Sequence, residues 1–148
     1  MATPPELLAA VRRRFGRLAW DLAANGDNSV TGKNRYFGPG AEFPDALKIR
    51  WPNLSDWCWL NPPYATIAPW AEKCAAESAR GCRVLLLVPA AVGADWFNEH
   101  VRRYAYVLEL TPRVRFVGHE HAYPKDLILC AYCPERLVGR ASWRWDDK

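Results

Sequence analysis

A short apolar run that ends in two consecutive prolines constrains this chain most. Residues 57–60 read Trp-Cys-Trp-Leu, and Asn61-Pro62-Pro63-Tyr64 follows them directly. Neither proline has an N–H to donate to a sheet, and each pushes the residue before it toward extended geometry. The run therefore predicts a buried strand that stops at these residues and leaves carbonyl groups free. An amide, free carbonyl oxygens and an aromatic ring together could bind a planar group that bears an amine, because the oxygens accept from its N–H groups and the ring stacks on its plane.

Strand and helix patterns alternate along the rest of the chain, which is typical of an α/β fold. Helices are predicted after Thr3-Pro4 and over 67–80 and 95–104. Strands are predicted over 18–24, 83–89, 106–110, 113–117 and 126–132. We expect one domain over residues 1–148. It should be a shortened Rossmann-like sheet, mostly parallel with an antiparallel C-terminal hairpin, and with helices on both faces.

The first helix carries its own boundary signals. Thr3 is a good N-cap, Glu6 stands three residues later as in a capping box, and Gly16 marks the end. Arginines at 12–14 lie between the apolar positions, which is typical of a solvated helix face.

Composition and charge restrict the class of protein. The 148 residues carry a net charge of +4, which is compatible with a polyanionic partner without establishing one. The sequence has no apolar run of about eighteen residues and no signal-peptide pattern, so we expect a cytoplasmic protein without a membrane span. Cys130 and Cys133 form a lone CxxC without a second ligand pair, so we expect no metal site.

The order of motifs resembles the small phage-type (Dam-like) DNA N6-adenine methyltransferases, which use S-adenosylmethionine. Single motifs are weak, but their shared order is specific and covers most of the chain. Besides Asn61 to Tyr64, the matching residues are Thr3-Pro4, Phe15-Gly16, Asp21-Leu22-Ala23-Ala24, Asn28, Tyr36, Asp45-Ala46-Leu47, Trp51, Pro69-Trp70, Lys73, Val88-Pro89-Ala90, Trp96-Phe97 and Arg113-Val114-Arg115-Phe116. Larger methyltransferases have a glycine-rich turn after the first strand, whereas residues 23–26 here read Ala-Ala-Asn-Gly.

The resemblance implies roles for the proline motif. A methyl group would pass in line from S-adenosylmethionine to the N6 amine of an adenine flipped out of DNA. The Asn61 side-chain oxygen and the Pro62 carbonyl would accept from the amine. Pro63 would fix the turn, and Tyr64 would stack on the base. If a phage or prophage encodes the chain, the enzyme would work in the cytoplasm of the host cell.

The expected cofactor residues are Thr3, Asp21, Leu22, Ala23 and Asp45. Ligands of open α/β sheets bind outside the carboxyl ends of strands, where a carboxylate such as Asp21 can face a cationic cofactor. The alternative is that Asp21 caps the next turn. Asp45 is expected to bond adenine or ribose, or else is a surface acid. Residues 25–50 leave little room for two strand–helix units, so we expect a long loop over the cofactor.

The expected partner is double-stranded DNA, with Arg113 and Arg115 on phosphates. Phe116 would cover the second face of the flipped base, or else it packs in the core. A domain this small lacks an obvious separate target-recognition domain, so we expect either a short DNA site or a homodimer. The tail over 142–146 alternates tryptophan with arginine and either packs back or contacts nucleic acid.

Two other functions stay open. One is a methyltransferase that acts on an RNA adenine or on a protein glutamine amide, since Asn-Pro-Pro-Tyr occurs in those classes too. The other is a catalytically inactive nucleic-acid-binding relic of the fold.

Overall fold

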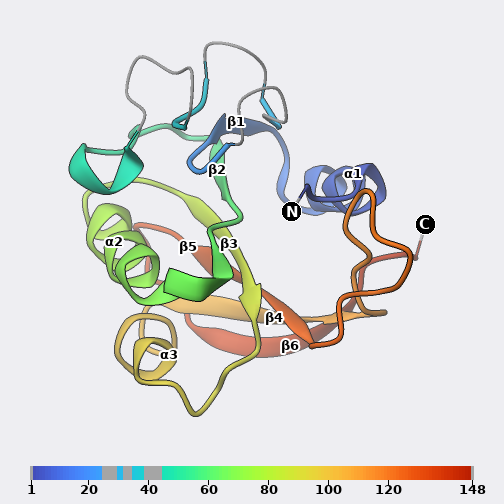
Figure 1. Ribbon diagram of the computed structural model, residues 1–148. Helices are drawn as coiled ribbons and strands as arrows, with labels where there is room; N and C mark the ends of the chain where they lie inside the picture. The colour runs from blue at the N-terminus through green and yellow to red at the C-terminus, as the bar shows by residue number, and fades with distance from the viewer. Residues whose placement is uncertain (1, 25–29, 32–34, 39–44, 148) are drawn as a thin grey trace.

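The computed structural model describes residues 2–24, 30–31, 35–38 and 45–147 (Figure 1). Within these ranges the elements are α1 (Pro5–Phe15), β1 (Leu18–Asp21), η2 (Ala46–Lys48), β2 (Trp57–Leu60), η3 (Tyr64–Thr66), α2 (Ile67–Ala79), β3 (Val84–Pro89), α3 (Asp95–His100), β4 (Ala105–Thr111), β5 (Leu127–Tyr132) and β6 (Gly139–Arg144).

The six strands form one mixed sheet in the order β1-β2-β3-β5-β4-β6. The pairs β1/β2, β2/β3 and β4/β6 are parallel, whereas β5 runs antiparallel to both β3 and β4. The prediction of a shortened, mostly parallel α/β sheet with antiparallel C-terminal strands is therefore confirmed.

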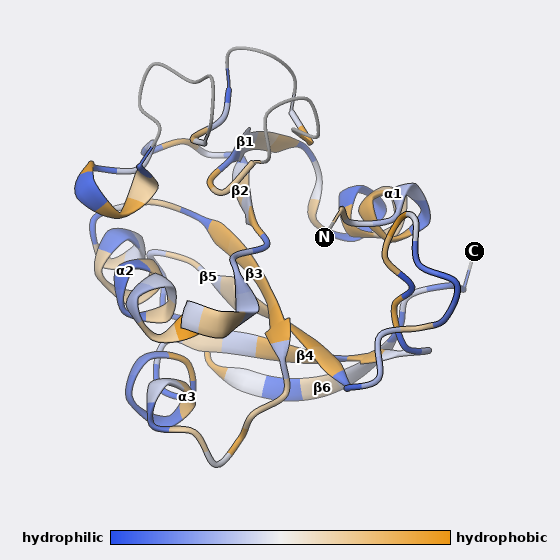
Figure 2. Cartoon of the chain, viewed as in Figure 1, coloured by the Kyte–Doolittle hydropathy of each residue, from blue (hydrophilic) through white to orange (hydrophobic). Residues whose placement is uncertain are grey.

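Helices cover both faces of this sheet (Figure 1). On β3, Leu86 and Val88 pack with α2 and α3, while Leu85 and Leu87 pack with α1 on the opposite face. Because both faces are buried, the strand can be apolar throughout, as Figure 2 shows by its colour. Among the described residues, no helix is long and apolar enough to cross a membrane.

The predicted strand over 113–117 is wrong. Pro112 has no N–H to donate, and the chain leaves the sheet after Thr111. Val114 and Phe116 then pack into the α1-side core, while Arg113 and Arg115 are exposed. The alternation of basic and apolar residues thus comes from a loop that lies on the core. The antiparallel hairpin is made by β4 and β5 instead.

Other expected boundaries also shift. The strand predicted over 18–24 ends at Asp21, and the helix predicted over 95–104 ends at His100. The C-terminal tail packs back, since β6 pairs with β4. Trp145 Nε1 then donates to the Pro112 carbonyl at 2.7 Å.

Thr3 is not the cap of the first helix. Pro4 is the N-cap residue of α1, and none of the described side chains caps this end, so the predicted capping box with Glu6 is wrong. The expected end of the helix is confirmed, because Gly16 takes φ +98°, a conformation that favours glycine. The arginines at 12–14 are exposed, as expected of a solvated face.

Much of the expected loop over 25–50, including Asn28, lies outside the described residues. Its segment 35–38 runs beside the end of β1. Asp21 N donates to the Arg35 carbonyl, Phe37 N to the Asp21 carbonyl and Ala24 N to the Phe37 carbonyl, each at 2.9 Å. The segment therefore extends the sheet edge where the candidate site begins.

Candidate functional site at the ends of β1 and β2

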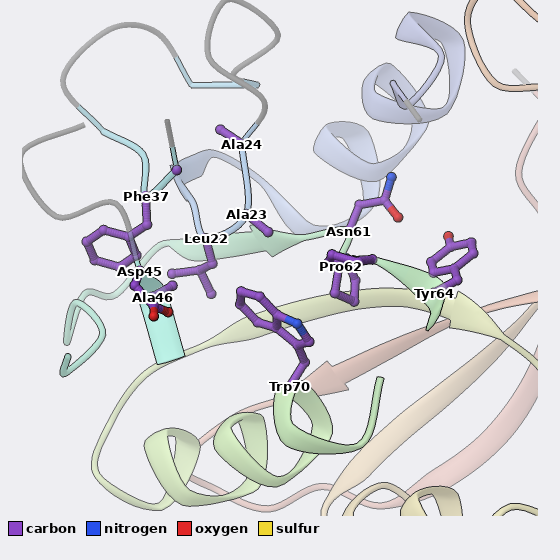
Figure 3. A pocket seen from close by; sticks show the side chains of 12 residues that line it. Leu22, Ala23, Ala24, Phe37, Asp45, Ala46, Asn61, Pro62, Tyr64 and Trp70 are labelled. Carbon is purple, nitrogen blue, oxygen red and sulfur yellow. The ribbon is translucent and has the colours of Figure 1, made fainter. Parts of the chain in front are cut away.

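A cavity of about 410 Å³ opens where the parallel strands β1 and β2 end (Figure 3). Its volume lies in the range typical of small-molecule sites, and its place at the carboxyl ends of strands is where open α/β sheets bind ligands. The residues that line it are Leu22, Ala23, Ala24, Phe37, Gly38, Asp45, Ala46, Asn61, Pro62, Pro63, Tyr64 and Trp70. Figure 3 shows Asn61 and Tyr64 at one end and Phe37, Asp45 and Ala46 at the other.

The β1 side of the cavity is built from closely approaching backbone. Leu22 N donates to the Trp59 carbonyl at 2.9 Å, which holds the turn after β1 against β2. Gly38 has φ +145°, and a Cβ on it would overlap the carbonyl oxygen of Ala24. Glycine is therefore required here by both conformation and space. The close backbone packing beside the turn at residues 23–26 thus depends on a glycine from a distant loop.

The proline motif forms the opposite end of the cavity. It leaves β2 directly, with Pro62 buried and Pro63 exposed. The Asn61 amide donates from Nδ2 to the Thr3 hydroxyl oxygen at 3.3 Å. With Nδ2 on Thr3, Asn61 Oδ1 points away from the Thr3 hydroxyl. The structure thus brings Thr3 to the site through Asn61, although Thr3 is not among the residues that line the cavity.

Tyr64 begins the short helix η3, and its ring is packed on two sides by aromatic rings. Its centroid lies 6.4 Å from Phe116 and 5.7 Å from Tyr123. Its hydroxyl is buried and has no hydrogen-bond partner within the described part of the chain. Burial raises the pKa of Tyr64 far above that of a free phenol, so the side chain stays neutral.

Asp21 lies behind the cavity wall and is only 3% exposed. Its Oδ1 accepts from Ala23 N at 3.2 Å and its Oδ2 from Val30 N at 3.0 Å. Burial raises its pKa, and the two backbone hydrogen bonds oppose that rise. In this structure the carboxylate holds the turn after β1, so its expected contact with a cofactor stays a prediction.

Asp45 does reach the cavity. Its Oδ1 accepts from Leu47 N at 3.1 Å and so caps η2, while its Oδ2 lies 3.7 Å from Lys48 Nζ. The side chain is half exposed, so it retains acceptor capacity toward a ligand. Of the predicted cofactor residues, the structure brings Leu22, Ala23 and Asp45 to the cavity.

A buried carboxylate that sequence analysis missed positions this wall. Glu77 of α2 is 2% exposed, and its Oε1 accepts from Trp51 N at 2.8 Å. Trp51 Nε1 in turn donates to the Ala46 carbonyl at 2.9 Å. Lys73 Nζ lies 3.3 Å from the carboxylate and Arg80 Nη1 3.5 Å, which compensates the buried charge. Nothing in the sequence distinguishes Glu77 from other acidic residues of helices, so its contact with Trp51 could not be predicted.

The predicted DNA-contacting residues do not line the first cavity. Arg113 and Arg115 are exposed, and Arg113 Nε pairs with Asp126 Oδ1 at 3.0 Å. Phe116 is 2% exposed, as expected of a core residue, although its ring touches Tyr64. All three border a second cavity, of about 630 Å³, between the start of α1 and Trp145. Their assignment to DNA stays a prediction.

In the described ranges, no group of three His, Cys, Asp or Glu side chains is placed to hold an ion. All five cysteines are buried free thiols.

These features define an open α/β protein with a small-molecule cavity bordered by Asn-Pro-Pro-Tyr at the ends of its parallel strands. The sequence matches the DNA N-6-adenine-methyltransferase (Dam) family over residues 1–127, and the chain belongs to this family. It is also 28% identical over 107 residues to a DNA N-6-adenine-methyltransferase of Escherichia phage T1. That match covers 72% of this chain and 42% of the phage protein, so the chain spans less than half of this relative's length.

Proposed function

We propose that this chain transfers a methyl group from S-adenosylmethionine to the N6 amine of adenine in double-stranded DNA. The carrying observation is the 410 Å³ cavity that joins the Asn61–Tyr64 motif to the turn after β1. Membership of the family and the activity of the phage relative support the same reaction.

The cavity end farther from Asn61 fits S-adenosylmethionine. Phe37, Trp70 and Leu22 offer apolar surface to a purine, and Asp45 offers carboxylate oxygens to an amine or to ribose hydroxyls. Gly38 packs against the Ala24 carbonyl with no room for a Cβ, which holds the segment 35–38 against the turn after β1 at this end of the cavity. When bound, the cofactor supplies an electrophilic methyl group. Thr3 and Asp21 remain predicted cofactor residues, and Asp21 would act through the turn after β1 and Thr3 through Asn61.

The Asn61 end suits the target base. The lone pair of the adenine amine is delocalised into the ring, so the amine is a poor nucleophile. Asn61 Oδ1 and the Pro62 carbonyl accept from its two N–H bonds and turn the lone pair toward the methyl carbon. The nitrogen–carbon bond forms as the carbon–sulfur bond breaks, and the amine then loses one proton to solvent. Tyr64 holds the plane of the base by stacking.

A duplex hides the adenine amine, so the base must leave the stack to reach Asn61, at a cost of a few kcal/mol. Arg113 and Arg115 are exposed beside the second cavity and would hold phosphates. Phe116 remains the predicted second aromatic face for the flipped base, and its edge contact with Tyr64 supports that role.

The test is methyl transfer from radiolabelled S-adenosylmethionine to unmethylated duplex DNA, RNA and a protein extract in parallel. Nucleoside analysis should recover the label as N6-methyldeoxyadenosine from DNA. Label in RNA or protein alone would move the proposal to another amine. Nucleic-acid binding without any cofactor binding would indicate an inactive relic.

A further inference from the structure

The second cavity, of about 630 Å³, adjoins the proposed base site. Its walls are the start of α1, the loop between β4 and β5, and the tail after β6 (Figure 1). Pro4, which lines it, follows Thr3, whose hydroxyl accepts from Asn61 Nδ2 at 3.3 Å. Phe116 also lines it, and the ring of Phe116 lies 6.4 Å from that of Tyr64. Two contacts between residues therefore join this cavity to the proline motif.

Hydrogen bonds hold the three walls of this cavity together. Val117 N donates to the Ala2 carbonyl at 3.0 Å, which ties the loop to the segment before α1. Trp145 Nε1 donates to the Pro112 carbonyl at 2.7 Å, which ties the tail to the loop. Three chain segments thus form one defined site, whose volume lies within the range typical of ligand cavities.

Three of the five titratable side chains that line this cavity form no ion pair or side-chain hydrogen bond within the described part of the chain. They are the exposed side chains of Glu6, Arg115 and His119. The other two are already paired, since Arg113 Nε lies 3.0 Å from Asp126 Oδ1, and Arg144 Nε lies 3.2 Å from Asp146 Oδ1. A carboxylate, a guanidinium and an imidazole therefore border one cavity with their hydrogen-bonding capacity unused.

A nucleotide of a DNA strand matches this set of groups. Arg115 donates to a phosphate, whereas the carboxylate of Glu6 only accepts and so suits the exocyclic amine of cytosine or adenine. Guanine and thymine present a carbonyl oxygen at that place in the major groove, and a carboxylate repels it. Pro5, Trp145 and Val117, which is 52% exposed, supply apolar surface beside these groups.

We infer that the second cavity holds the nucleotide next to the target adenine on the same strand, and that Glu6 selects cytosine or adenine there. This inference rests on the proposed function. The contacts of Thr3 and Phe116 with the proline motif place the cavity beside the flipped base, where a neighbouring nucleotide of the continuous strand lies. Arg115 binds the phosphate of this nucleotide, and Glu6 accepts from its amine at the major-groove edge. Sequence choice then takes place in the same domain as methyl transfer.

The first measurement maps the bases on both sides of the methylated adenine after the full chain has acted on duplexes that are randomised at these positions. The unaltered chain should require cytosine or adenine on one side. Glu6→Ala should accept all four bases at that position, because it removes both the acceptor and the repulsion. The matched control is Glu99→Ala, which changes an exposed acid of α3 outside this cavity and should keep the original preference.

Two results of this mapping would overturn the inference. One is an unaltered chain that requires neither cytosine nor adenine at either neighbouring position. The other is an unchanged preference in Glu6→Ala.

A second measurement separates the hydrogen bond from a structural effect of Glu6. When the selected base is replaced by an analogue without the exocyclic amine, kcat/KM of the unaltered chain should fall about 5- to 150-fold. Glu6→Ala should lose little between the same two duplexes, and thermal unfolding should show that its fold is unchanged. An equal loss in both proteins would contradict a hydrogen bond between Glu6 and the amine.

The inference and the proposed function can fail separately. If the unaltered chain transferred no methyl groups to DNA, the proposed function would fail and this inference with it. An active chain whose choice of neighbouring base does not depend on Glu6 rejects the inference alone.

Discussion

The Asn61 side chain and the Thr3 hydroxyl are joined by a hydrogen bond of 3.3 Å that spans 58 positions of sequence. It links the segment before α1 to the strand end that carries the proline motif. Because an amide carries its oxygen opposite its nitrogen, the bond aims Asn61 Oδ1 away from Thr3. Thr3 is thus a positioning residue for the group that we propose to accept from the adenine amine.

Thr3→Val should lower kcat about 2- to 12-fold, the range expected for one neutral hydrogen bond. The variant keeps the shape of the side chain but offers Asn61 no acceptor. Steady-state kinetics check this, with thermal unfolding to show an unchanged fold. Thr3→Ser keeps the hydroxyl and should restore the rate, which a purely steric role would not explain.

Gly38→Ala should weaken binding of S-adenosylmethionine and destabilise the chain by about 1–3 kcal/mol, because the new Cβ meets the Ala24 carbonyl and φ is positive. Calorimetric titration and denaturant unfolding measure the two effects. Gly93→Ala is the matched control, since no described atom lies within 4 Å of its added Cβ and its φ is not positive. Equal effects of the two changes would contradict the assigned close approach.

Trp51→Phe should weaken cofactor binding while leaving most of the fold intact, because it removes the hydrogen bond to the Ala46 carbonyl and keeps an aromatic ring. Glu77→Ala should cost about 1–3 kcal/mol of stability, since it leaves the buried Trp51 N–H without its acceptor. Denaturant unfolding and cofactor titration separate these cases. If Trp51→Phe bound the cofactor as tightly as the unaltered chain, Asp45 and Ala46 would not need the hydrogen bond from Trp51 to hold them in place.

Tyr64 gives a pH dependence whose sign follows from its raised pKa. The unfolded chain ionises this tyrosine near pH 10, whereas the folded chain keeps it neutral, so its contribution to stability is full below about pH 10 and is lost as the pH rises above that. Tyr64→Phe should therefore lose less stability than the unaltered chain between about pH 10 and pH 11.5. It should be no less stable at pH 7, because the hydroxyl is unpaired. If the free energy of unfolding fell equally in both proteins over this pH range, the burial of Tyr64 would not be the cause of the pH dependence.

Local sequence patterns were enough to predict a strand wherever one continuous apolar run is buried. Residues 57–60 and 84–89 form continuous apolar runs and are β2 and β3, and the proline motif lies where β2 ends. The loop at 113–117 was predicted as a strand because basic and apolar residues alternate in it. The same alternation arises where a loop lies on a core.

Contacts between distant segments explain what the sequence could not predict. Gly38 matters only because its loop returns to the Ala24 carbonyl, and Glu77 only because Trp51, 26 positions earlier, donates to it. Tyr123 gave no signal, since nothing in its neighbourhood indicates that the loop meets Tyr64.

The most direct test of the central claim maps N6-methyladenine at single-nucleotide resolution in bacteria that lack their own adenine methylation. Cells that express the chain should show methylated adenines in one short DNA sequence. Asn61→Ala should leave none, with the protein folded and still able to bind S-adenosylmethionine, because only the acceptor for the amine is lost. Methylation by Asn61→Ala at the level of the unaltered chain would contradict the assignment of the Asn61–Tyr64 motif as the base site.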